Sequence, residues 1–143
     1  MPPSHVLVPL DGSPLADDAL AHALETFDCG VTVLNVVTPI GASMSEGGVL
    51  EPGDERESEA RERAERLVKQ ARDRTAEGDR RVEAVVETGD PAETILKAVG
   101  ERGVDHVVMG GHGGDRSDLG RRLLGTVATT VVGEAPVTVT VVR

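Results

Sequence analysis

Five short apolar runs, rich in β-branched residues, alternate along the chain with longer segments of helical character. The runs are HVLVPL at 5–10, VTVLNVV at 31–37, RVEAVVE at 81–87, VDHVVMG at 104–110 and VTVTVV at 137–142. Continuous valine-rich runs are typical of parallel strands covered on both faces, and alternation with helices favours a parallel sheet. We therefore predict an open, doubly wound α/β fold with helices on both faces of a five-stranded parallel sheet.

Capping residues predict where helices begin. Ser13 followed by Pro14, and Asp90 followed by Pro91, each place a side chain that can cap before a proline at the first helical position. Apolar residues at helical spacing follow both turns. A further helix is predicted over 126–132, where Gly125-Thr126 provides the turn.

The middle of the chain departs from this alternation. Residues 38–54 are rich in glycine and proline and predict a loop. Residues 55–76 are strongly charged around a narrow apolar stripe, which predicts a helix with its outer face in water. Gly30 and Gly133 are predicted to end helical units. Because no repeat or linker divides the chain, we expect a single domain over 1–143.

Composition excludes several classes of partner. Twenty-five acidic and 15 basic side chains give a net charge of −10, whereas nucleic acids and anionic membranes bind basic surfaces. Phe27 is the one aromatic residue, so stacking platforms for single-stranded nucleic acid are excluded. With no basic leader and no long apolar run, we expect a cytoplasmic protein without a nucleic-acid or membrane partner. The acidic surface suits a halophile's cytoplasm, although a GC-rich genome alone would explain the preference for arginine over lysine.

The segment from Met109 to Thr126 carries the strongest local indication of a ligand. It reads MGGHGGDRSDLGRRLLGT and joins a predicted strand to a predicted helix. Glycines let a backbone approach a ligand closely, and the free N–H groups at a helix start bind anions. Arg116, Arg121 and Arg122 lie nearby. These are the parts of a phosphate site, and a glycine-rich surface loop without a ligand is the alternative. Neither the P-loop pattern nor GxGxxG is complete.

No catalytic constellation is visible in the sequence. The four histidines are scattered, no nucleophile is paired with a base, and the HExxH spacing is lacking. A single cysteine, Cys29, can form neither an intramolecular disulfide nor a cysteine zinc site. We therefore expect no catalytic or metal-ligating residues, no flavin or NAD, and at most slow hydrolysis of a bound nucleotide.

Several motifs resemble those of the universal stress protein family. They are Pro9-Leu10-Asp11 for its Pro-x-Asp, Asn35-Val36-Val37 for its His-Val pair, Gly89-Asp90-Pro91 for its Gly-x-Pro, and VDHVVMGGHGG…RRLLGTVATTVV…APVTVTVVR for its last third. The resemblance covers essentially the whole chain. It implies a fold of the adenine nucleotide alpha hydrolase type, with strand order 3-2-1-4-5.

The resemblance also implies a site for ATP or AMP, with Mg²⁺ able to accompany ATP. The residues it assigns to the base and sugar are Pro9, Leu10, Asp11, Val36, Met109 and Gly110, and those it assigns to the phosphates are Gly113, Gly125, Thr126 and Val127. In ATP-binding members nine residues separate the last two signature glycines, whereas eleven separate Gly113 from Gly125 here, or ten if the signature starts at Gly111 and Gly114. The longer loop favours the alternative, a family member that binds no nucleotide and acts as a protein-interaction or chaperone-like module.

The last predicted strand bears on assembly. A strand over Val137 to Val142 at the sheet edge would expose unpaired backbone groups, and it contains no lysine or proline to protect them. Pairing with a second copy across a two-fold axis would cover that edge. The resemblance implies the same arrangement, because many members dimerise through this strand. We expect a homodimeric stress-response regulator, and an edge covered by the chain's own loops is the alternative.

Overall fold

Five parallel strands form the centre of the computed structural model. They are β1 (His5–Leu10), β2 (Gly30–Val37), β3 (Val82–Thr88), β4 (His106–Gly110) and β5 (Thr138–Val142). Their order in the sheet is β3-β2-β1-β4-β5, and every neighbouring pair is parallel. The predicted fold class and strand order are confirmed. The structure describes residues 3–11, 13–38, 55, 58–66, 69, 81–111 and 124–143.

Three helices connect or follow these strands, namely α1 (Pro14–Thr26), α3 (Pro91–Glu101) and α5 (Thr126–Glu134). The two predicted caps are confirmed. The Ser13 hydroxyl accepts the N–H of Ala16 at 3.2 Å, and the Asp90 carboxylate accepts the N–H of Glu93 at 3.0 Å. Each cap satisfies a backbone donor that lacks an intrahelical acceptor, so these two helices begin where the local sequence predicts.

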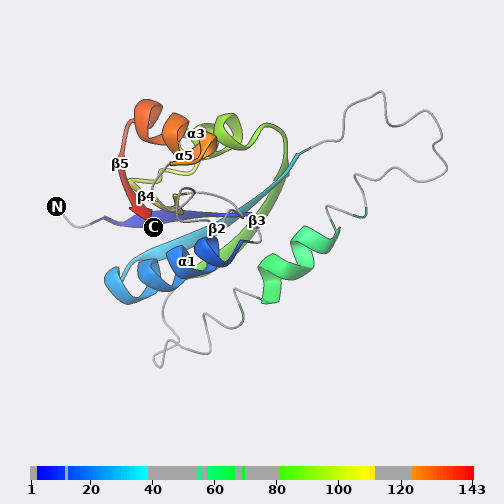
Figure 1. Cartoon of the computed structure of the whole chain (residues 1–143). Coiled ribbons are helices and arrows are strands. Elements are labelled where there is room, and N and C mark those ends of the chain that lie inside the picture. Colours follow the sequence, from blue (N-terminus) through cyan, green and yellow to red (C-terminus); the bar gives the residue numbers. More distant parts are fainter. Residues whose placement is uncertain are drawn as a thin grey trace.

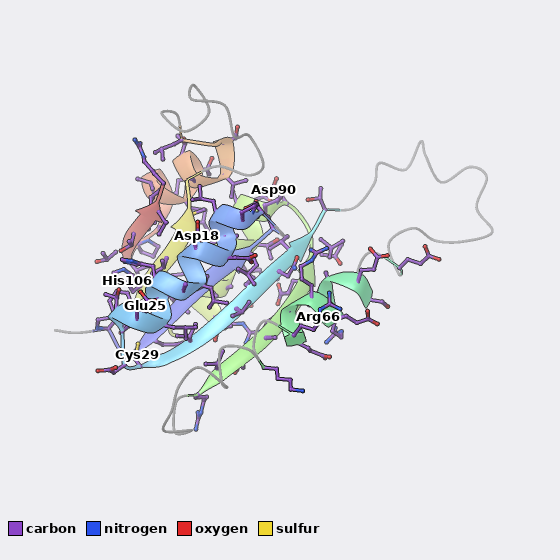
Figure 2. The ribbon with its side chains drawn as sticks, turned by 60° about the horizontal axis from the view of Figure 1, so that its bottom comes forward. Asp18, Glu25, Cys29, Arg66, Asp90 and His106 are labelled. Carbon is purple, nitrogen blue, oxygen red and sulfur yellow. The ribbon has the colours of Figure 1, made fainter. Side chains whose placement is uncertain are left out.

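A further helical stretch includes residues 55, 58–66 and 69. Ala60 and Ala64 are buried in it, as the predicted apolar stripe requires, and most of the charged side chains between them are exposed. The stretch lies on the same side of the sheet as α1 (Figures 1 and 2).

The sheet separates two apolar layers. On one face, Val8 and Val33 of the sheet pack with Ala19 and other residues of α1. On the other face, Leu34 of the sheet packs with residues of α3 and α5, including Ile95. Figure 1 shows α1 on one side of the strands and both α3 and α5 on the opposite side. Helices on both faces are therefore confirmed, and the core contains mainly valine, leucine, isoleucine and alanine.

The predicted end of the last helix is wrong. Gly133 lies inside α5, which continues to Glu134. Ala135 then adopts extended backbone angles, φ −66° and ψ 134°. It precedes Pro136, and proline disfavours helical geometry in the residue before it. Proline, rather than glycine, therefore sets this helix end.

The predicted role of Gly30 is wrong as well. The helix α1 ends at Thr26, where Phe27 takes an extended conformation and donates its N–H to the Ala23 carbonyl. Gly30 is instead the first residue of β2. In the part of the chain that the structure describes, no helix is long and apolar enough to cross a membrane.

Candidate functional site

A cavity of about 530 Å³ lies at the carboxyl ends of β1, β2 and β4. From β1 the chain proceeds to β2 and β3 on one side, then returns through α3 to β4 on the other side of β1. Such a switch point is where open parallel sheets bind ligands, and this volume suits a small molecule. The lining residues are Pro9, Leu10, Asp11, Ser13, Ala16, Asn35, Val36, Val37, Thr38, Glu59, Ala60, Arg63, Pro91, Ile95, Met109, Gly110, Gly125, Thr126, Val127 and Ala128.

The predicted site residues gather at this cavity from three separate parts of the chain. Those that line it are Pro9, Leu10, Asp11, Val36, Met109, Gly110, Gly125, Thr126 and Val127. Gly113 lies outside the described residues, as do His112, Arg116, Arg121 and Arg122. Parallel strands bring their carboxyl ends to one edge, so residues distant in sequence meet there.

The close approach of β4 to the first turn of α1 explains the glycine at position 110. A Cβ atom at Gly110 would lie 3.2 Å from the carbonyl carbon of Leu15 and 3.2 Å from its Cγ. The preceding residue, Met109, is 4% exposed and packs in the opposite core layer. Gly110 therefore lets the end of β4 and the start of α1 form adjoining walls of the cavity.

The amino end of α5 presents backbone donors to the cavity. Its cap residue, Gly125, has no side chain to accept a bond, and the first intrahelical bond runs from the Thr129 N–H to the Gly125 carbonyl. The N–H groups of Thr126, Val127 and Ala128 therefore have no acceptor within the helix. All three residues line the cavity. Free N–H groups and the positive end of the helix dipole favour an anion here.

Two backbone hydrogen bonds hold this helix start against the sheet. The Gly125 N–H donates to the Gly111 carbonyl at 2.6 Å, and the Gly111 N–H donates to the Val142 carbonyl at 2.8 Å. Gly111 and Gly125 are therefore neighbours, and Gly111 is bonded to the end of β5. This pairing fixes where α5 begins relative to β4.

Asp11 has a structural role and also borders the cavity. One of its carboxylate oxygens, Oδ1, accepts the Ser13 N–H at 2.9 Å, which organises the turn before α1. The side chain is exposed at the cavity wall. Further along α1, burial raises the pKa of Asp17, and the charges of Asp18 and Asp11 raise it further, whereas Arg63 opposes the shift.

Five polar residues of the cavity wall were not predicted as site residues, namely Ser13, Asn35, Thr38, Glu59 and Arg63. Asn35 is 3% exposed, and its Nδ2 atom has no hydrogen-bond partner among the described residues. Glu59 and Arg63 come from the helical stretch that was interpreted as a solvated face. They are four positions apart and flank the buried Ala60, which is the pattern that could have placed them against the sheet.

An open parallel sheet with a cavity at its switch point defines a class of α/β proteins that bind small ligands beyond the strand ends. Within this class, residues 3–143 match the model of the universal stress protein family, and the chain belongs to that family.

Curated relatives carry the same family name. Universal stress protein YxiE of Bacillus subtilis is 29% identical over an alignment of 146 residues. The alignment covers 96% of this chain and 97% of that protein. A universal stress protein of Methanothermobacter thermautotrophicus is 43% identical over 60 residues, which cover only 42% of this chain and 39% of that protein.

Solved structures share the fold. Universal stress protein UspA from Lactobacillus plantarum has a TM-score of 0.84 at 21% identity, with 100% of this chain and 99% of that chain covered. A universal stress protein family member from Arabidopsis thaliana, with AMP bound, has a TM-score of 0.63 at 24% identity, with 98% and 91% covered.

Proposed function

We propose that this protein binds an adenine nucleotide, ATP or AMP, in the cavity at the carboxyl ends of β1, β2 and β4. The observation that carries the proposal is the amino end of α5, where Thr126 and Val127 line this cavity and their N–H groups have no acceptor within the helix. The AMP bound to the Arabidopsis family member supports the choice of nucleotide.

The residues present fit such a ligand. Three consecutive backbone donors and a helix dipole provide phosphate ligands in a chain that is otherwise strongly acidic. Gly110 lets the end of β4 pack against the first turn of α1, and it lines the same cavity. Asn35 lines the cavity on the β2 side. Apolar wall residues, including Val36 and Met109, would take the place of a stacking ring.

In this arrangement the N–H groups of Thr126 and Val127 hold the phosphate, together with Gly125 and Gly113. Asp11 binds the ribose or the base of the nucleotide. The backbones of Pro9, Leu10 and Val36 contact the same part of the ligand. Mg²⁺ would supply charge neutralisation if the ligand is ATP.

Replacing Thr126 with proline tests the phosphate site. Thr126 is the first helical residue, where proline is well tolerated, and Gly125 already has the extended angles that a residue before proline prefers. Thr126→Pro therefore removes one N–H donor and preserves the helix. We expect AMP affinity by calorimetry to fall tenfold or more, because a hydrogen bond to a charged group is lost. Thr126→Ala keeps the donor and is the matched control.

The wild-type protein decides between this proposal and its alternative. We expect denatured, freshly purified protein to release an adenine nucleotide detectable by mass spectrometry, or purified protein to bind added AMP or ATP. Absence of both would favour a protein-interaction or chaperone-like module, to which the lengthened segment between Gly113 and Gly125 points.

We further propose that the protein is a homodimer joined through β5. This strand lies at the edge of the sheet, paired only with β4 among the described strands, and its first residue, Thr138, is exposed. A lysine at an edge position opposes strand pairing between copies. Wild-type protein should therefore sediment as a dimer, and Thr138→Lys should shift it toward a monomer; a wild-type monomer would contradict the proposal.

A further inference from the structure

We propose that His106 makes the homodimer sensitive to pH, because protonation of its imidazole ring weakens the association of two copies through β5. This inference rests on the proposed homodimer and adds a form of regulation to it. The effect falls in the weakly acidic range, where histidine is the side chain that ordinarily titrates.

The first observation is the contact between His106 and the edge strand. His106 is the first residue of β4, and its Nε2 atom lies 2.8 Å from the hydroxyl oxygen of Thr140 in β5. Among the described strands, β5 pairs only with β4. The ring is therefore bonded to the strand that forms the proposed interface, and this one strand separates it from the outer edge of the sheet.

The second observation is the burial of the ring. His106 is 9% exposed, and its ring centroid lies 4.7 Å from that of Phe27, the residue that follows α1 (Figure 2). Its register neighbours are Val6 in β1, which is buried, and Thr138 in β5, which is exposed. None of these three side chains carries a charge that would compensate an imidazolium ion for the water it loses.

Asp105 is the charged residue that opposes the effect of this burial. Burial lowers the pKa of His106, and the charge of Asp105, the preceding residue, raises it by a smaller amount. At the end of α1, Glu25 and Asp28 are exposed and Cys29 is half-buried, and none of the three contributes to the shift. The neutral ring is therefore the favoured form in the folded protein.

Pairing of two copies through β5 would replace the water beyond this strand with protein. Loss of water around a charge disfavours the charged form, so the imidazolium ion is less favourable in the dimer than in the monomer. The joined sheet would also bring two such rings to within three strand spacings, or about 14 Å, of each other across the interface. Like charges repel, so both effects make protonation favour the separated copies.

Analytical ultracentrifugation from about pH 7.5 to about pH 5.0 tests this coupling across the range where histidine titrates. We expect the dimer dissociation constant of wild-type protein to rise about tenfold, since a roughly threefold effect at each of two rings multiplies. In His106→Gln the side-chain amide can still bond to Thr140 but does not titrate, so this rise should disappear. His22→Gln, at an exposed position of α1, is the matched control and should keep the rise.

An NMR titration of the His106 ring in wild-type protein gives a test that needs no variant. Its pKa should be lower in concentrated protein, where the dimer predominates, than in dilute protein, where the monomer does. Equal pKa values at the two concentrations, or the same rise of the dissociation constant in His106→Gln, would overturn the inference. Wild-type protein that is monomeric at every concentration at neutral pH would instead overturn the proposed homodimer.

Discussion

Two glycine-to-alanine substitutions should change stability in opposite directions. At Gly110 a new Cβ atom would lie 3.2 Å from the carbonyl carbon of Leu15, 3.2 Å from its Cγ and 3.3 Å from its carbonyl oxygen. Two of these atoms are backbone atoms in the first turn of α1, so a side-chain rotation cannot relieve the contact. At Gly100, in α3, a new Cβ meets no atom within 4 Å.

The magnitudes follow from these contacts. Overpacking of this kind costs about 1–3 kcal/mol. Gly110 is not among the described glycines with positive φ, so the contact alone produces the cost. Gly100 is an exposed helical position, where alanine is favoured over glycine by about 0.5–1 kcal/mol. For a chain of this size 1 kcal/mol shifts the unfolding midpoint by roughly 2–4 °C.

Thermal unfolding followed by circular dichroism measures both effects. We expect Gly110→Ala to unfold roughly 3–10 °C below wild-type protein, and Gly100→Ala to unfold a few degrees above it. Because Ser13 and Ala16 in the first turn of α1 line the cavity, Gly110→Ala should also weaken AMP binding, whereas Gly100→Ala should not. Equal stability of the two variants would refute the reasoning.

Three further predictions concern single side chains. Asp90→Ala should lower stability by about 1 kcal/mol in denaturant titration, since the cap of α3 is lost. The backbone N–H of Ser4 donates to the Asp105 carboxylate and lowers its pKa. Asp105→Asn should therefore be less stable than wild-type protein at pH 7. This difference in stability should disappear as the pH falls from about 4 through the lowered folded pKa. Burial lowers the pKa of His106 in the folded protein. Its contribution to the free energy of unfolding is therefore complete above about pH 6.5 and declines as the pH falls through the lower folded pKa. His106→Asn should flatten this part of the profile of stability against pH.

Local sequence predicts the strands and the helix starts, because the residues that determine these elements lie within them or beside them. Valine-rich runs and the caps at Ser13 and Asp90 act within a few residues, and the structure has strands and helices there. The order of the strands in the sheet could not be predicted from local sequence, because one valine-rich run is much like another. That order came from the family resemblance, which covers the whole chain.

The cavity wall was only partly predictable, for a physical reason. Gly110, Gly125 and Thr126 stand out because glycine and a helix start are recognisable in sequence. Asn35 does not stand out, because its unpaired amide results from burial between strands that are distant in sequence. The position of Arg63 depends on how its helical stretch lies against the sheet.

A titration of isotopically labelled protein with AMP, followed by amide NMR, tests the central claim most directly. It reports the dissociation constant and the location of the ligand together. The account predicts saturable shifts, with one constant, at the backbone amides of Thr126, Val127 and Gly110. Thr32, at the amino end of the sheet, should not shift. Saturable shifts confined to that opposite edge, or no shifts at millimolar AMP, would contradict it.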